Sequence, residues 1–277
     1  MFTHSKKLQY EAQPEKADPV MARQLQDILG GQWGEMTGMV SYLYQGWNAT
    51  GYDQYKDLLL DTGTEEIGHV EMIATMITRL LRDASTEEQE KFYKNGDPAL
   101  QAAMDGADPQ QAVVNGLGAG PTDANGNPWT AAYAGASGNL LADMRYNVVR
   151  ESMARVSVTR LYHMTEDKGV RDMLSYLMGR ETQHQLQFIQ AVEDLEEEYG
   201  IVVPHGTKDL ENQEVSHTLY SFSEGDASRS VVEGKIAKDG EPFKYHDGPL
   251  VSEDIQGVGK TMKEMHNNEG QEENKDN

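Results

Sequence analysis

The chain has 277 residues, enough for one large domain with a substantial hydrophobic core. Its 46 acidic residues outnumber 24 basic ones, and the resulting net charge of −22 argues against binding to nucleic acid phosphates or to an anionic membrane surface. The absence of cysteine excludes disulfides, iron–sulfur clusters, Cys-ligated zinc and thiolate nucleophiles.

The first half of the chain predicts an arm followed by two long helices. Residues 1–18 are polar and are expected to form an arm without a core of its own. Apolar residues then recur at spacings of three and four over residues 19–47, which predicts one long helix that the Gly30-Gly31 pair bends. After a turn the same period continues to Arg82 and predicts the second long helix.

A long connection is expected between the second and third long helices. Ser85 followed by Glu88 fits a capping box and predicts a short helix, and another short helix is expected up to Val114. Residues 115–138 are rich in glycine and contain two prolines, a composition typical of an irregular connection. A crossover that links two pairs of helices would need a segment of this length.

Two further long helices complete the predicted bundle. They are expected over residues 139–166 and 169–199, again from the helical period of their apolar residues. The bundle domain therefore spans residues 19–199. Periodicity is lost after it, so residues 200–262 are expected to form an extended, irregular segment that makes intersubunit contacts, and the polar residues 263–277 to be disordered.

Two Glu-x-x-His motifs carry the chemistry of this sequence. They occupy residues 66–69 and 181–184, on the second and fourth long helices, and Glu and His at i and i+3 lie on one helix face. Glu35 lies 31 residues before the first motif, and Glu151 lies 30 residues before the second. A third match at residues 214–217 lies in the aperiodic tail and is interpreted as accidental. The repeated pattern is the ligand set of ferritin-like dimetal carboxylate bundles.

Such a cluster of carboxylates and imidazoles indicates bound metal. Ionised groups buried in a bundle core are too costly unless they are paired or coordinated, and two divalent cations would neutralise them. Oxygen and imidazole ligands without sulfur suit manganese or non-haem iron better than structural zinc, and spacing alone leaves both metals open. Glu65, one position before Glu66, points in a different direction from the helix and is expected to face solvent or a neighbouring helix rather than the metals.

At these residues the sequence resembles the manganese catalase family. The resemblance rests on the segments Gly34-Glu35-Met36, Glu65-Glu66-Ile67-Gly68-His69, Arg150-Glu151-Ser152 and Arg180-Glu181-Thr182-Gln183-His184-Gln185, and it extends over residues 1–250. It implies a catalase that disproportionates hydrogen peroxide to water and dioxygen at two manganese ions, which cycle between Mn(II) and Mn(III) pairs.

The resemblance also implies roles for individual ligands. Glu35 and His69 would bind one manganese, Glu151 and His184 would bind the other, and Glu66 would bridge the pair.

Three further residues would act around the metals. The resemblance implies that Glu181 stays outside the ligand set and moves protons, that Arg150 hydrogen-bonds to the ligands, and that Tyr42 supports them from the helix that carries Glu35. The helix pattern alone leaves open that Glu181 is a second bridging ligand and that Arg150 belongs to a surface ion pair.

A calcium site is a further implication of the resemblance. Asp57 and Asp61 are one helical turn apart, and relatives with calcium would pair them with Ser221, Ser223 and Gly225. Oxygen ligands fit calcium, although two acidic residues on a helix are also typical of a solvated face. Calcium would attach the tail to the bundle, within a homo-oligomer that the resemblance implies is a hexamer.

Two other functions remain open at this point. The ligand pattern also permits a ferritin-like di-iron oxidase or peroxidase, or a non-enzymatic metal-storing or coat protein. The sequence shows no signal-peptide core and no apolar run of the roughly 20 residues that span a bilayer, so a cytoplasmic protein is predicted, with the spore as the other compartment left open.

Overall fold

The computed structural model describes residues 4–81, 106, 110–204, 210–222, 232 and 234–251. The chain divides into two compact units, Met1–Leu195 and Glu196–Asn277. Each unit is described by itself.

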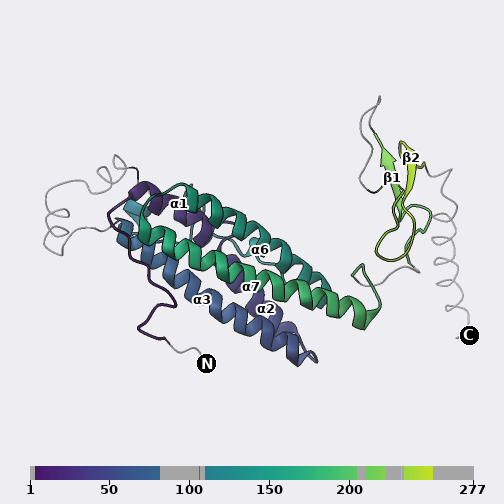
Figure 1. Ribbon diagram of the computed structural model, residues 1–277, viewed down its shortest axis with the longest axis horizontal. Coiled ribbons are helices and arrows are strands. Elements are labelled where there is room, and N and C mark those ends of the chain that lie inside the picture. The colour runs from purple at the N-terminus through teal and green to yellow at the C-terminus, as the bar shows by residue number, and fades with distance from the viewer. Residues whose placement is uncertain are drawn as a thin grey trace, which may run out of the picture. The chain divides into compact units, whose positions relative to one another are not determined.

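Long helices dominate the first unit (Figure 1). The α-helices of the described residues are α1 (Pro19–Gly30), α2 (Glu35–Asn48), α3 (Asp53–Leu81), α6 (Leu140–His163) and α7 (Lys168–Tyr199). Both α1 and α2 contact α3 and α6, so the consecutive short helices share one position in the bundle. The predicted mainly α fold is confirmed. In the ranges that the structure describes, no helix is both long and apolar enough to cross a bilayer.

The segment between α1 and α2 differs from the predicted bent helix. The prediction of one continuous helix is wrong, because Gly31 adopts an extended conformation with φ −71° and ψ 172° and ends α1. Gly30 packs so closely on the crossover that a Cβ atom there would lie 2.5 Å from the carbonyl oxygen of Thr122. The break therefore reflects a tertiary contact that the local pattern could not show.

Side-chain caps fix the starts of α1 and α6. Asp18 accepts a hydrogen bond from the backbone nitrogen of Met21, at 2.9 Å, ahead of Pro19 at the first helical position of α1. Asn139 caps α6 in the same way through the backbone nitrogen of Ala142. Caps of this kind stabilise a helix by about 1 kcal/mol each. The third predicted long helix ends three residues early, at His163 rather than Glu166.

The apolar core lies next to the polar site along the same helices. It is formed by buried residues of α1, the C-terminal halves of α3 and α6, and the N-terminal part of α7. Its largest fully buried members include Met21, Leu25, Ile28, Met72, Ile73, Met76, Ile77 and Leu80. Burial of each such side chain contributes about 1.5–3 kcal/mol. On α3 this cluster follows the first Glu-x-x-His motif, and on α7 it precedes the second.

The crossover packs against the first two helices. Gln26 of α1 donates to the carbonyl oxygens of Gly120 and Thr122, at 2.7 and 2.8 Å. Trp129 donates from its ring nitrogen to the hydroxyl of Thr37 in α2, at 3.0 Å. The predicted capping box at Ser85 lies outside the described residues.

Short turns of helix are the regular structure of this connection. A single π-helical turn, η1 (Gln110–Val114), precedes the crossover, and a 3₁₀ turn, η2 (Ala131–Tyr133), lies within it. Otherwise the described part of the connection is irregular, as its composition indicated.

The N-terminal arm is attached to the bundle. Ala12 is fully buried, and its carbonyl oxygen accepts a hydrogen bond from Arg79, at 2.7 Å. Tyr10 stacks on Tyr176 of α7 with a ring separation of 4.7 Å. The arm therefore packs against the core of the bundle instead of forming a core of its own.

Two short strands lie in the described part of the second unit. β1 (Thr218–Ser221) and β2 (Lys244–Asp247) pair in parallel, with Thr218 opposite Lys244 and Ser221 opposite Asp247. The predicted disorder of residues 263–277 concerns a segment outside the described residues.

Candidate metal centre

The predicted ligands meet in the interior of the bundle. Glu35 is the first residue of α2, Glu66 and His69 lie on α3, Glu151 lies on α6 and His184 lies on α7. All five are buried, with at most 1% of each residue exposed. Helices far apart in the sequence thus deliver carboxylates and imidazoles to one place, as the motif spacing predicted.

Two groups of potential metal ligands share one carboxylate. Glu35, Glu66 and His69 form the first group, and Glu66, Glu151 and His184 form the second, each with its donor atoms within 4.8 Å of one another. Nδ1 of His69 lies 2.7 Å from Oε2 of Glu66, and Nδ1 of His184 lies 3.3 Å from Oε1. Each oxygen of Glu66 therefore faces a different imidazole.

Arg150 connects the carboxylates of both groups. Its guanidinium is fully buried and donates to Glu35 at 2.9 Å, to Glu151 at 2.8 Å and to Glu66 at 3.3 Å. The alternative of a surface ion pair is wrong for this residue. Gly38 provides the space, since a Cβ atom there would lie 2.4 Å from the guanidinium carbon.

Tyr42 lies against the same carboxylates. Its hydroxyl donates a short hydrogen bond to Oε1 of Glu151 and accepts one from Arg150 at 3.2 Å. Its ring packs on Phe188 with centroids 5.0 Å apart. Burial raises the pKa of Tyr42 well above its ordinary value, so the hydroxyl stays protonated and remains a donor.

Glu181 occupies a different electrostatic position from Glu66. Both are fully buried, but neither oxygen of Glu181 has a hydrogen-bond partner among the described residues. Burial, together with the charges of Glu35 and Glu151, raises the pKa of Glu181 well above its ordinary value. Burial opposes the charge of Glu66 too, but Arg150 and His69 outweigh it and lower its pKa. Without metal, the surroundings thus favour the neutral form of Glu181 and the charged form of Glu66.

The donor set fits two divalent cations. Glu35, Glu66, Glu151 and Glu181 are four buried carboxyl groups that share the interior with the imidazoles of His69 and His184, a set of oxygen and nitrogen donors. Both ring nitrogens of His184, together with Oε2 of Glu151, are buried without hydrogen bonds in the described part of the chain. Buried polar atoms are normally satisfied, and a metal ion supplies the missing partner.

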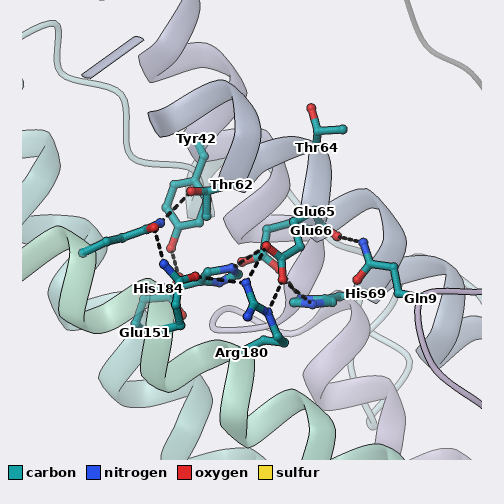
Figure 2. Close-up of polar contacts among 12 residues, drawn as sticks. Gln9, Tyr42, Thr62, Thr64, Glu65, Glu66, His69, Glu151, Arg180 and His184 are labelled. Carbon is teal, nitrogen blue, oxygen red and sulfur yellow. Dashed lines mark hydrogen bonds and ion pairs between the residues drawn. The ribbon is translucent and has the colours of Figure 1, made fainter. Parts of the chain in front are cut away.

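Glu65 faces the neighbouring helix α7, one of the two surroundings expected for it, but sequence reasoning missed its contact with the histidines. Its carboxylate lies between the outer edges of both imidazoles and Arg180 (Figure 2). Partial burial opposes its charge, but His184, His69 and Arg180 lower its pKa well below the usual range. The sequence signal that could have indicated this contact was the position of Glu65 directly before Glu66.

Asp57 and Asp61 of the predicted calcium site are exposed on α3 of the first unit, and Ser221 lies in β1 of the second. Ser223 and Gly225 lie outside the described residues. In the accidental motif, His217 lies 2.8 Å from Asp239 and 3.0 Å from Ser216, near β1.

Comparison with known proteins shows which family this chain matches. A family model described as manganese containing catalase matches residues 1–270. A manganese catalase from Lactiplantibacillus plantarum is 55% identical over 270 residues, which cover 98% of this chain and 100% of that protein. A manganese catalase from Bacillus subtilis strain 168 is 52% identical over 249 residues, 88% of this chain and 90% of that protein.

Solved structures agree on the fold. The crystal structure of KatB, a manganese catalase from Anabaena PCC7120, matches with a TM-score of 0.68 and covers 90% of this chain and 100% of that one, at 24% identity. The predicted ferritin-like helical fold is thereby confirmed.

Proposed function

This chain belongs to the manganese-containing catalase family, and from that premise we propose that it disproportionates hydrogen peroxide into water and dioxygen at a pair of manganese ions. The observation that carries the proposal is the buried pair of ligand groups that share Glu66. Glu35 and His69 would hold one ion, Glu151 and His184 the other, and Glu66 would contact both. When bound, two ions that each change oxidation state by one match the two-electron chemistry of peroxide.

Glu181 is proposed to hold a proton between the two halves of the reaction. Oxidation of one peroxide to dioxygen releases two protons and two electrons, and reduction of a second peroxide to two waters consumes them. A buried carboxylic acid can donate its proton in the half that consumes protons and take one back in the half that releases them. The burial of Glu181 and its two unpartnered oxygens support this role.

Arg150 and Tyr42 are proposed to orient the ligands. Arginine does not lose its proton in proteins, so Arg150 serves as a fixed donor rather than a proton carrier. It contacts Glu35, Glu66 and Glu151, and one displacement would therefore disturb all three carboxylates. Tyr42 donates to the same oxygen of Glu151 that accepts from Arg150. The burial of both residues keeps bulk water from competing for these hydrogen bonds.

Metal content and oxygen release test the function together. Native protein is analysed for manganese and iron, and dioxygen released from peroxide is measured in the presence of azide, which suppresses contaminating haem catalase. We expect two manganese ions per chain and one dioxygen for every two peroxides. Chelated protein serves as the control. Iron in place of manganese, or peroxide loss without dioxygen, would favour the di-iron oxidase alternative.

Calcium, oligomeric state and location remain proposals. We infer calcium binding from the family resemblance and from the oxygen ligands of Asp57 and Asp61 on one face of α3. Calcium analysis before and after treatment with a calcium-selective chelator tests it. We likewise propose a hexamer, to be checked by light scattering, and a cytoplasmic location, to be checked by fractionation of the source cells.

A further inference from the structure

Glu65 contacts both imidazoles on the side away from the shared carboxylate. Its Oε2 lies 3.2 Å from Nε2 of His184, and its Oε1 lies 3.5 Å from Nε2 of His69. Both contacts are at or beyond the long end of the hydrogen-bond range, and neither nitrogen has a hydrogen bond of conventional geometry within the described residues. The Nδ1 atoms face Glu66 instead. One carboxylate therefore faces the outer nitrogens of two rings whose inner nitrogens face the metal ligands.

Arg180 fixes the carboxylate in this position. Its Nε lies 2.5 Å from Oε1 of Glu65, and its Nη2 lies 3.1 Å from Oε2, which is a two-pronged contact that sets the plane of the carboxylate (Figure 2). Each oxygen of Glu65 thus faces one arginine nitrogen and one histidine nitrogen. The two side chains come from α3 and α7, the helices that also carry His69 and His184.

The pair closes the outer side of the site. The side chains of Glu65 and Arg180 are 23% and 35% exposed, whereas those of His69 and His184 are at most 1% exposed. If this were only a surface ion pair, it would contribute about 0–1 kcal/mol and would not affect the metals. The contact of Glu65 with both imidazoles distinguishes the Glu65–Arg180 pair from an ordinary surface ion pair.

We propose that Glu65, held by Arg180, is a positioning residue that orients both histidine ligands of the proposed manganese pair. An acceptor at Nε2 keeps the proton on that nitrogen and leaves Nδ1 free to bind metal. It also makes the imidazole a stronger electron donor. Because one carboxylate serves both rings, its loss affects both metal positions together. The inference rests on the proposed function for the identity of the metal.

The test is manganese binding to the metal-free, full-length protein. Calorimetric titration with manganese chloride compares the wild type with Glu65→Gln. The amide of glutamine can accept from one ring only and carries no charge, so we expect both manganese equivalents to bind about 10–100-fold more weakly. Glu65→Asp restores the charge and should recover part of the affinity. Glu71→Gln is the matched control, because it removes a charge from α3 whose partner is His4, at 3.5 Å.

A second variant and a second measurement distinguish a role in orienting the histidines from a general loss of structure. Arg180→Lys retains the opposite charge but loses the two-pronged contact, so it should weaken both equivalents less than Glu65→Gln does. A redox titration of the loaded proteins should show a more positive potential for the manganese pair in Glu65→Gln and an unchanged one in Glu71→Gln.

The outcomes separate this inference from the proposed function. Wild-type affinity and potential in Glu65→Gln, or weakening of one equivalent alone, would overturn the inference. If Glu65→Gln does not fold, wild-type binding by Arg180→Lys overturns it instead. Calorimetry needs no turnover, so a wild-type protein that binds two manganese ions without releasing dioxygen would refute the catalase function and leave the role of Glu65 standing.

Discussion

Alanine at position 38 should displace the arginine at the centre of the site. The new Cβ would lie 2.4 Å from the guanidinium carbon of Arg150, whereas ordinary contact requires at least 3.4 Å, so the guanidinium must move by about 1 Å. That movement would break its contacts of 2.8 and 2.9 Å with Glu151 and Glu35. Breaking a buried ion pair costs about 3–5 kcal/mol, and the better helix propensity of alanine returns about 0.5–1 kcal/mol. We expect a net destabilisation of about 2–4 kcal/mol.

Urea unfolding of the metal-free protein, followed by circular dichroism at equal chain concentrations, measures this change. Gly179→Ala is the matched control, since Gly179 lies inside α7 and a Cβ atom there would meet nothing within 4 Å. The same substitution should stabilise the protein by about 0.5–1 kcal/mol at that position. Equal stability of Gly38→Ala and Gly179→Ala would refute the packing argument.

Three further predictions concern the site itself. Glu181→Gln should retain both manganese ions, as checked by metal analysis, and its turnover should fall about 10²–10⁴-fold, as measured with an oxygen electrode. Loss of one ion would identify Glu181 as a ligand. Tyr42→Phe should also keep both metals but lower stability by about 1 kcal/mol in urea unfolding, because Glu151 loses a donor; unchanged stability would contradict this. Burial opposes the charge of His184, but Glu65 and Glu66 outweigh it and raise its pKa from 6.5 to about 9 in the metal-free protein. The resulting stabilisation is complete below pH 6.5 and is lost as the pH rises through 9, so unfolding of the metal-free protein should become easier over this range, and a flat profile would refute the assignment.

The sequence predicted the site well because the site follows helical geometry. Glu66 and His69 are three residues apart on α3, and that spacing alone places both on one face. The similar intervals from Glu35 to Glu66 and from Glu151 to Glu181 indicated that two helix pairs repeat the arrangement. Such local rules require no knowledge of which helices are neighbours.

Features that depend on neighbouring helices were not predictable in the same way. Glu65 was judged from its angle on α3, but its role depends on α7, which brings Arg180 to it. The end of α1 depends likewise on the backbone of Thr122, about 90 residues later in the chain, which leaves no room for a side chain at Gly30. Spacing within one helix cannot reveal the surface against which that helix packs.

The similar halves of the bundle differ chemically because of one pair of positions. Gly34 precedes Glu35 in the first half, and Arg150 precedes Glu151 in the second. The carbonyl oxygen of Gly34 accepts a hydrogen bond from Arg150 at 3.3 Å, so the guanidinium of one half reaches the backbone of the other. The same guanidinium donates to Glu66, whereas Glu181 has no hydrogen-bond donor in the described part of the chain. Arg150 and His69 thus lower the pKa of Glu66, whereas burial and the charges of Glu35 and Glu151 raise that of Glu181.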